Sequence, residues 1–299
     1  MTWELIGVPY TSAREPGGIA DAIAVLRDCE LARRLTDLGV EDGGDMVLGA
    51  PSAERGASGL LNEAALAELV RASESRVHET YRRDRRPLLV GGDCPVLLGP
   101  LAAIGAAGER PGLIMIDGHE DAWPPERSET GEGSDSEVAL ALGRVPALPR
   151  ALAEAIRVLP PSAIAQLGPR DQAELDAAGV PSLRDELGYF ASGGDLSAGG
   201  DSGETLARRA IEGVEAGGFW LHVDLDVLAT AEFRAVDYPQ PGGLDWTTLD
   251  RVSLAAARHR RCRGVSVVIY NPALDPDRAD ARKLVDYLAR LMEGLLPTR

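Results

Sequence analysis

Short apolar runs, each separated from the next by an amphipathic or loop segment, recur along most of the 299 residues. The runs are nearly continuous in apolar residues, which is typical of a parallel sheet covered on both faces. Segments rich in Ala, Leu, Glu and Arg at helical spacing lie between them, for example 21–39, 61–83 and 281–296. This alternation predicts a three-layer α/β/α fold with about eight parallel strands. We expect the strands at 4–9, 45–50, 87–92, 112–117, 163–168, 180–183, 219–224 and 264–269.

The alternation continues without a clear break, so residues 1–299 are expected to form a single α/β domain. One stretch, 191–204, is rich in Gly, Ser and Asp, and its composition predicts a surface loop.

The charge balance excludes several classes of partner. The formal net charge is −16, which argues against binding to nucleic acid or to an anionic membrane, because both repel an acidic surface. Lys283 is the single lysine, and the sequence has no Gly-rich loop ending in Lys-Ser or Lys-Thr, so phosphate binding by a P-loop is excluded. A small cationic substrate would fit the sign of the charge.

The cysteines and the N-terminal sequence suggest where the protein works. Three cysteines, Cys29, Cys94 and Cys262, lie far apart and do not form a disulfide framework. The first residues read as a strand rather than as a signal peptide, and no apolar stretch nears the roughly 18 residues that span a membrane. We therefore expect a soluble, cytoplasmic protein.

Potential metal ligands follow three of the predicted strands. The strand at 87–92 is followed by Asp93 and Cys94. The strand at 112–117 ends with Asp117 and is followed by His119 and Asp121. The strand at 219–224 ends with Asp224 and is followed by Asp226. Ligands bind at the carboxyl ends of the strands in open α/β sheets, so these groups are expected to meet at one edge. Carboxylates and imidazole suit a hard divalent cation such as Mn²⁺, and two ions about 3.5–4 Å apart need bridging carboxylates.

Each of these residues taken alone has a simpler interpretation. An Asp after a strand is usually a turn former or a helix N-cap, which we favour for Asp93. Cys94 alone would be a small buried apolar side chain. The remaining histidines, His78, His222 and His259, lie in helix-like or strand-interior contexts and receive no role. The combination of three strand ends with complementary ligand types favours a metal site.

The same motifs resemble those of the arginase/agmatinase (ureohydrolase) family. "GGDC" (91–94) resembles the family's GGDH, "IDGHEDAWPP" (116–125) its DAHxDxxxP, and "HVDLDVLATAEF" (222–233) its SxDxDxxDP. Weaker matches are 5–27, "DGGDM" (42–46) and "LGPRD" (167–171), so the resemblance covers nearly the whole chain. It implies an α/β/α fold, a binuclear manganese site and a homo-oligomer.

The resemblance also implies roles for individual residues. Asp117 and Asp224 would bridge the two ions, His119 and Asp226 would complete one site, and Asp121 and Cys94 would complete the other. His119 and Asp121 would also act in catalysis, with Asp121 accepting a hydrogen bond from a metal-bound hydroxide and moving its proton.

Four positions depart from the family pattern. Cys94 replaces a histidine ligand, and its soft sulfur would favour Zn²⁺ or Fe²⁺ over Mn²⁺, or leave a single ion. Ile269, followed by Tyr270, stands where a Glu holds the guanidinium in guanidine-cleaving members. The segment 131–143 lacks the histidine suspected of moving a proton, and Ser134, Asp135 or Glu137 could replace it. Gln172 and Ala173 follow "LGPRD" where an acid would bind an amino group.

These observations predict a metal-dependent hydrolase that acts on a small molecule. The bond cleaved would be a C–N bond of a guanidine or amidine, an N-hydroxyguanidine among them, or of an amide. Ordinary arginase activity is doubtful, because Ile269 leaves a guanidinium without its carboxylate partner. Asp135, Glu137, Ile269 and Tyr270 are the expected substrate residues. The alternative is a degenerate member of the fold that binds a ligand or partner without turnover.

Overall fold

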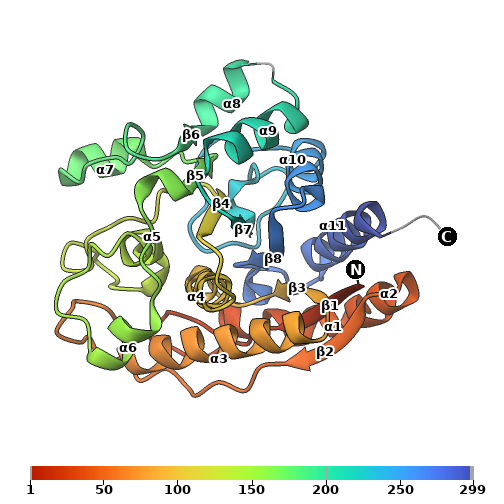
Figure 1. Cartoon of the computed structure of the whole chain (residues 1–299), viewed down its shortest axis with the longest axis horizontal. Coiled ribbons are helices and arrows are strands. Elements are labelled where there is room, and N and C mark those ends of the chain that lie inside the picture. Colours follow the sequence, from red (N-terminus) through yellow and green to blue (C-terminus); the bar gives the residue numbers. More distant parts are fainter. Residues whose placement is uncertain (1, 200, 297–299) are drawn as a thin grey trace.

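An eight-stranded sheet lies at the centre of the computed structural model, which describes residues 2–199 and 201–296 (Figure 1). All strand pairs are parallel, and the spatial order is β2-β1-β3-β8-β7-β4-β5-β6. The strands are β1 Thr2–Gly7, β2 Glu41–Asp45, β3 Arg85–Val90, β4 Pro111–Ile116, β5 Ile164–Leu167, β6 Tyr189–Ala191, β7 Gly218–Asp224 and β8 Cys262–Val268. The predicted α/β class and parallel sheet are thus confirmed.

Helices cover both faces of the sheet, as the continuous apolar runs require. On one face α3 packs on α4, α6 and β3, and α4 packs on β4 and β7. On the other face α10 packs on α9, α11 and β8, and α11 packs on α1 and α2, so that the two groups are separate in Figure 1. The helices are α1 Ala22–Asp28, α2 Leu31–Leu38, α3 Glu63–Arg82, α4 Leu98–Ala106, α5 Glu137–Ala141, α6 Arg150–Ala155, α7 Gln172–Ala178, α8 Gly193–Gly199, α9 Gly203–Gly213, α10 Trp246–Arg258 and α11 Ala279–Leu295. Within the described ranges, no helix is both long and apolar enough to cross a membrane.

Several predicted element bounds are wrong, mostly at the sheet edges. Strand β2 ends where the strand predicted at 45–50 was to begin, and its polar sequence EDGGD suits an edge strand that pairs only with β1. Residues 180–183 are not a strand. The strand at that edge of the sheet is β6, which follows them at Tyr189–Ala191. The predicted loop 191–204 contains α8, and the helix predicted over 21–39 is broken at Glu30, whose φ is 67°.

The register of the central strands brings the acidic motifs together. Val90 pairs with Val267, Val267 with Val223, and Val223 with Ile116. The next residues of β7 and of the chain after β4 are Asp224 and Asp117, so these two carboxylates leave adjacent parallel strands at the same level. Adjacent strands are about 4.8 Å apart, which is a distance that one cation can span.

The turn after β5 packs against the chain that follows β4, at Gly168. Gly168 has φ 112°, and a Cβ there would lie 2.5 Å from the Asp117 carbonyl oxygen and 2.6 Å from Val227 Cγ2. Gly179 also has a positive φ, 65°, but a Cβ there would meet nothing within 4 Å.

Gly179→Ala should cost about 1 kcal/mol of unfolding free energy, from the backbone alone. Gly168→Ala should cost about 2 kcal/mol more, because the chain after β4 must move. Urea denaturation measures both losses, and equal losses would contradict this role of Gly168.

Candidate functional site

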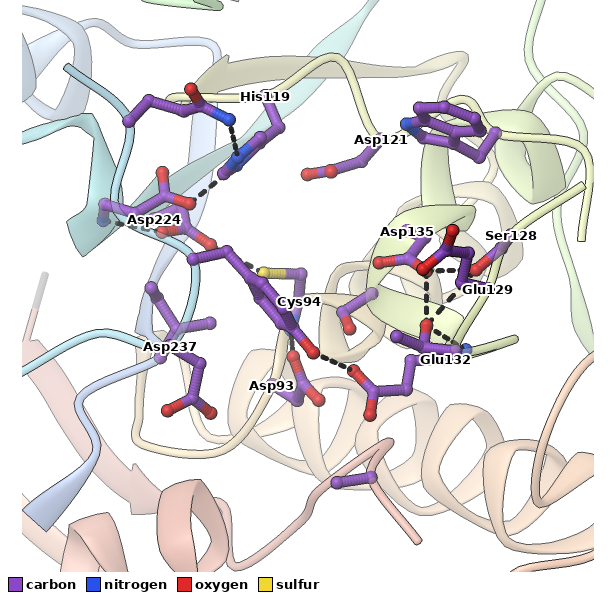
Figure 2. A pocket seen from close by; sticks show the side chains of 18 of the residues that line it. Asp93, Cys94, His119, Asp121, Ser128, Glu129, Glu132, Asp135, Asp224 and Asp237 are labelled. Carbon is purple, nitrogen blue, oxygen red and sulfur yellow. Dashed lines mark hydrogen bonds and ion pairs between the residues drawn. The ribbon is translucent and has the colours of Figure 1, made fainter. Parts of the chain in front are cut away.

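A cavity of about 810 Å³ opens at the carboxyl ends of the central strands. Its wall includes residues that follow β3, β4, β7 and β8, together with the segment 127–135 and the loop 237–241. Figure 2 shows His119 and Asp224 on one side of this cavity and Ser128, Glu129, Glu132 and Asp135 on the other. The three strand ends singled out from the sequence therefore do meet in one place.

The half-buried His119 and the buried Asp226 form an ion pair in the cavity wall. Asp226 Oδ2 lies 2.7 Å from His119 Nδ1, and its other oxygen accepts a hydrogen bond from the Gly118 N–H at 2.8 Å. Asp117 Oδ1 accepts from the His119 N–H at 2.8 Å, and Asp224 Oδ1 accepts from the Asp226 N–H at 2.7 Å. The carboxylates thus fix the two turns that carry them.

Proton affinities in this cluster follow from burial and from the neighbouring charges. Burial, followed by the nearby Asp226 carboxylate, raises the pKa of both Asp117 and Asp224 well above its usual range. Burial alone would lower the pKa of His119, but Asp226 and Asp117 outweigh it and raise that pKa to about 10. His119, Asp117 and Asp224 therefore favour their protonated forms in the absence of a cation that would compensate the negative charge.

Cys94 lies beside Asp224, as the motif comparison requires, and its thiol donates a hydrogen bond to Asp224 Oδ2 at 2.7 Å. Burial, and then the negative charge of Asp224, raises the pKa of this thiol. Ligand atoms of Cys94, Asp117 and His222 lie within 4.8 Å of one another. Asp93 follows its simpler interpretation, since it caps the short helix Cys94–Leu97 and accepts hydrogen bonds from the N–H groups of Ser12 and Cys94.

His222 is a residue of this site that the sequence interpretation missed. It is fully buried, its Nδ1 lies 2.7 Å from Ser266 Oγ, and its Nε2 has no hydrogen-bond partner among the described residues. Burial lowers the pKa of its imidazole to about 3, so the ring is neutral. The signal was present, because residues two apart in a strand share a face and His222 precedes Asp224 by two.

Asp121 lies between the cavity and Glu137. Ligand atoms of Asp117, Asp121 and Glu137 are within 4.8 Å of one another. Burial, and then the charge of Glu137, raises the pKa of Asp121 well above its usual range. Glu137 was predicted to touch substrate, but it begins α5, is fully buried and is not among the residues that form the cavity wall.

Of the other predicted substrate residues, Asp135 and Ile269 line the cavity and Tyr270 does not. Asp135 and Ser134 line the cavity, and Asp135 accepts a hydrogen bond from Thr130 Oγ1 at 2.6 Å. Ile269 also lines it, with φ 64°, a conformation that a β-branched residue rarely adopts. Tyr270 instead points into the core, where its hydroxyl donates to Asp275 at 2.9 Å.

Several groups in the cavity wall were not predicted from the sequence. Tyr238 donates a hydrogen bond to Glu132 at 3.3 Å. Gln240 Nε2 lies 3.3 Å from His119 Nε2 and donates to Glu174 at 2.9 Å. Glu132 lies in the segment 127–135, Glu174 on α7, and Tyr238 and Gln240 in the loop 237–241, so no single periodic pattern marks them.

The donors at this edge fit divalent metal ions. Three overlapping groups of possible ligands share Asp117: one with Cys94 and His222, one with His119 and Asp226, and one with Asp121 and Glu137; all of these residues are buried except the half-buried His119. Asp117 Oδ2 and both oxygens of Glu137 have no hydrogen-bond partner among the described residues. Unpaired buried carboxylate oxygens are costly unless a proton or a cation compensates them.

Comparisons with known proteins agree with this geometry. The model of the arginase family matches residues 3–293. The chain is 26% identical to an arginase of Staphylococcus aureus (strain MRSA252) over 294 residues, which cover 94% of each protein. It superposes on the native arginase structure of Bacillus caldovelox with a TM-score of 0.80 at 25% identity, covering 100% of this chain and 99% of the other. Formimidoylglutamase of Bacillus subtilis subsp. subtilis str. 168 shares the fold (TM-score 0.73, 19% identity, coverage 99% and 87%).

The repulsion among the buried acids leads to a test of metal binding. In Asp117→Asn the side-chain oxygen can still accept from the His119 N–H, while the cluster loses an acid whose ionisation burial and Asp226 disfavour. Without metal, the variant should therefore have a free energy of unfolding about 1 kcal/mol higher than that of wild type, which raises its melting temperature by about 2 °C. A Mn²⁺ concentration of about 100 Kd should raise the free energy of unfolding of the wild type by about 2.7 kcal/mol, and Asp117→Asn should lose most of this increase.

Thermal unfolding with EDTA and with Mn²⁺ measures both effects. Asp185→Asn, which removes an exposed carboxylate outside the cavity wall, should behave as wild type. An equal Mn²⁺ response in Asp117→Asn would show that Asp117 does not contact the ion.

Proposed function

Because this chain belongs to the arginase family, whose members are metal-dependent amidinohydrolases, we propose that it hydrolyses a C–N bond in a small molecule. The proposed substrate is a cationic guanidine or amidine that carries no carboxylate. The acidic wall of the cavity is the observation that carries this proposal. Its carboxylates are Asp93, Asp121, Glu129, Glu132, Asp135, Glu174, Asp224, Asp226 and Asp237. Among the described residues, Arg127 is the only arginine or lysine in that wall.

A wall of this kind selects substrates by charge. Like charges facing each other in a partly desolvated site are costly, whereas a cation gains from each nearby carboxylate. Burial, and then the charges of Asp93 and Asp135, raises the pKa of Glu132 to about 7, so a further negative charge beside it would be unfavourable. A substrate carboxylate, such as that of arginine, would add to this repulsion. Arginine is therefore expected to be a poor substrate.

The proposed metal ligands lie at the base of the cavity. Asp117 and Asp224 would be shared between two ions, His119 and Asp226 would hold one, and Asp121 would hold the other, with Cys94 nearby. The mainly carboxylate donor set favours Mn²⁺, and Zn²⁺ or Fe²⁺ would be favoured if Cys94 is a ligand. Such ions, when bound, supply an acidic water as nucleophile and offset negative charge in the transition state.

The chain's own side chains would orient the substrate and move protons. Asp121 faces the cavity beside the proposed metal position, so its carboxylate can take the proton released as the central carbon is attacked. Gln240 contacts His119 Nε2 and fixes the ring in the cavity. Ile269 presents apolar surface, so the cation would be held by acidic groups elsewhere in the wall, such as Asp135 and Glu132.

A panel of guanidines tests this proposal. With Mn²⁺ present, agmatine carries a cationic amine and no carboxylate, arginine carries both, and 4-guanidinobutyrate carries only the carboxylate. The kcat/KM for urea release should be at least about tenfold higher for agmatine than for arginine, a difference of about 1.4 kcal/mol. Comparable values for arginine would overturn the charge argument. The N-hydroxyguanidine analogues belong in the same panel. Release of neither urea nor ammonia from any compound would favour the alternative of binding without turnover.

Glu132 gives a sharper test, because it lies in the wall but outside the proposed metal ligands. Glu132→Gln should lower the ratio of kcat/KM for agmatine to that for 4-guanidinobutyrate about fivefold, or by about 1 kcal/mol. Glu293→Gln removes an exposed carboxylate on α11 and should leave the ratio unchanged. An unchanged ratio in Glu132→Gln as well would mean that substrate charge is read elsewhere.

A further inference from the structure

Glu137 is a buried acid that substrate contact does not explain. It is the first residue of α5, its side chain is fully buried, and it is not part of the cavity wall. Among the described residues, neither of its carboxylate oxygens has a hydrogen-bond partner by geometry. The Asp121 carboxyl lies against it, so the two acids can share a proton, but this contact brings no positive charge.

The backbone holds Glu137 against Asp121 through several hydrogen bonds. The N–H of Val138 donates to the Asp121 carbonyl at 3.0 Å, and the Trp123 N–H donates to the Asp135 carbonyl at 3.0 Å. Ser136 Oγ donates to the Trp123 carbonyl at 2.8 Å. The segments 121–123 and 135–138 are therefore joined side by side, which fixes the acid in place. A purely structural role would not need a charged group at such a position.

Cys94 is poorly placed to complete the ligands around Asp121. Its sulfur is grouped with Asp117 and His222, and its hydrogen bond goes to Asp224. Glu137, in contrast, is grouped with Asp117 and Asp121, with the three ligand atoms within 4.8 Å of one another. Thiolate ligation would also require the loss of a proton from a buried group surrounded by acids, whereas Glu137 offers oxygen, the donor that hard cations prefer.

We infer that Glu137 is a metal ligand, and that Asp117, Asp121 and Glu137 together hold one divalent cation through oxygen alone. This inference rests on the metal-dependent function proposed above and changes one of its ligands. Glu137 supplies the donor that the Cys94 position lacks. The second ion would keep His119, Asp226 and the shared carboxylates. The inferred site is hard in character, so it should take Mn²⁺ in preference to Zn²⁺.

Metal stoichiometry tests the assignment without any substrate. Chelator-treated protein is titrated with Mn²⁺ by calorimetry, and the bound metal is counted after gel filtration. Wild type should bind two equivalents. Glu137→Gln should lose one, or bind it at least about tenfold more weakly, because the amide removes the charge and offers one acceptor oxygen. Cys94→Ser, the matched control, should keep two.

Electron paramagnetic resonance of the Mn²⁺-loaded protein gives a second readout. Wild type and Cys94→Ser should show the spin coupling of a close ion pair, and Glu137→Gln should show an isolated ion. Glu137→Asp keeps the charge on a shorter side chain and should recover part of the second equivalent. Circular dichroism and thermal unfolding show whether each variant is folded.

Each outcome has a definite meaning. Any one of three results would overturn the assignment. Glu137→Gln could bind two equivalents of Mn²⁺ with unchanged affinity, Cys94→Ser could lose the second equivalent, or wild type could bind fewer than two. The proposed activity fails separately: a protein that binds two Mn²⁺ through Glu137 but cleaves no guanidine or amidine contradicts the activity and leaves the ligand assignment standing.

Discussion

Electrostatic repulsion among acids buried at one edge of a parallel sheet is the constraint on which this site depends. Asp117 and Asp224 leave neighbouring strands at the same level, and Asp226, Asp121 and Glu137 follow close by. The strands behind them are fully buried in the apolar core, so the backbone that carries these acids holds their charges close together. Such a cluster is stable only with compensating protons or cations, and the choice between them links folding to metal binding.

The compensation is uneven across the cluster. On one side, His119 lies 2.7 Å from Asp226 and can carry the positive charge itself. On the other side, Asp121 and Glu137 face each other, and the described part of the chain places no arginine or lysine in the surrounding cavity wall other than Arg127. A cation would therefore gain from the acids around Asp121. Under the ligand assignment inferred above, Glu137 would be the carboxylate that completes the ligands there.

The sequence predicted those parts of the molecule that follow from periodicity and from strand order. Continuous apolar runs indicated the central strands, and the ligands after them meet at one edge because parallel strands align their carboxyl ends. The edge elements were harder to predict, since β2 is polar and β6 is three residues long. His222 could have been found from its spacing to Asp224. Glu137 could not be distinguished from a substrate residue, because its burial depends on the pairing of 121–123 with 135–138, which no local pattern encodes.

The two halves of the site are therefore predictable to different degrees, for a physical reason. Acids on strand ends are positioned by the register of a rigid sheet, so a short motif is sufficient to place them. Glu132 and Gln240 stand on loops whose course is set by tertiary contacts, and such loops differ between relatives that share a fold. Motif resemblance thus carries information about the metal chemistry, whereas the charge of the cavity wall, read from the structure, carries information about the substrate. Ile269 lies where the two meet. Its strained backbone just after β8 is held by a hydrogen bond from its N–H to the Gly92 carbonyl. Its apolar side chain in the cavity wall offers a cation no partner, so under the proposed function the acidic loops of the wall would recognise the cation.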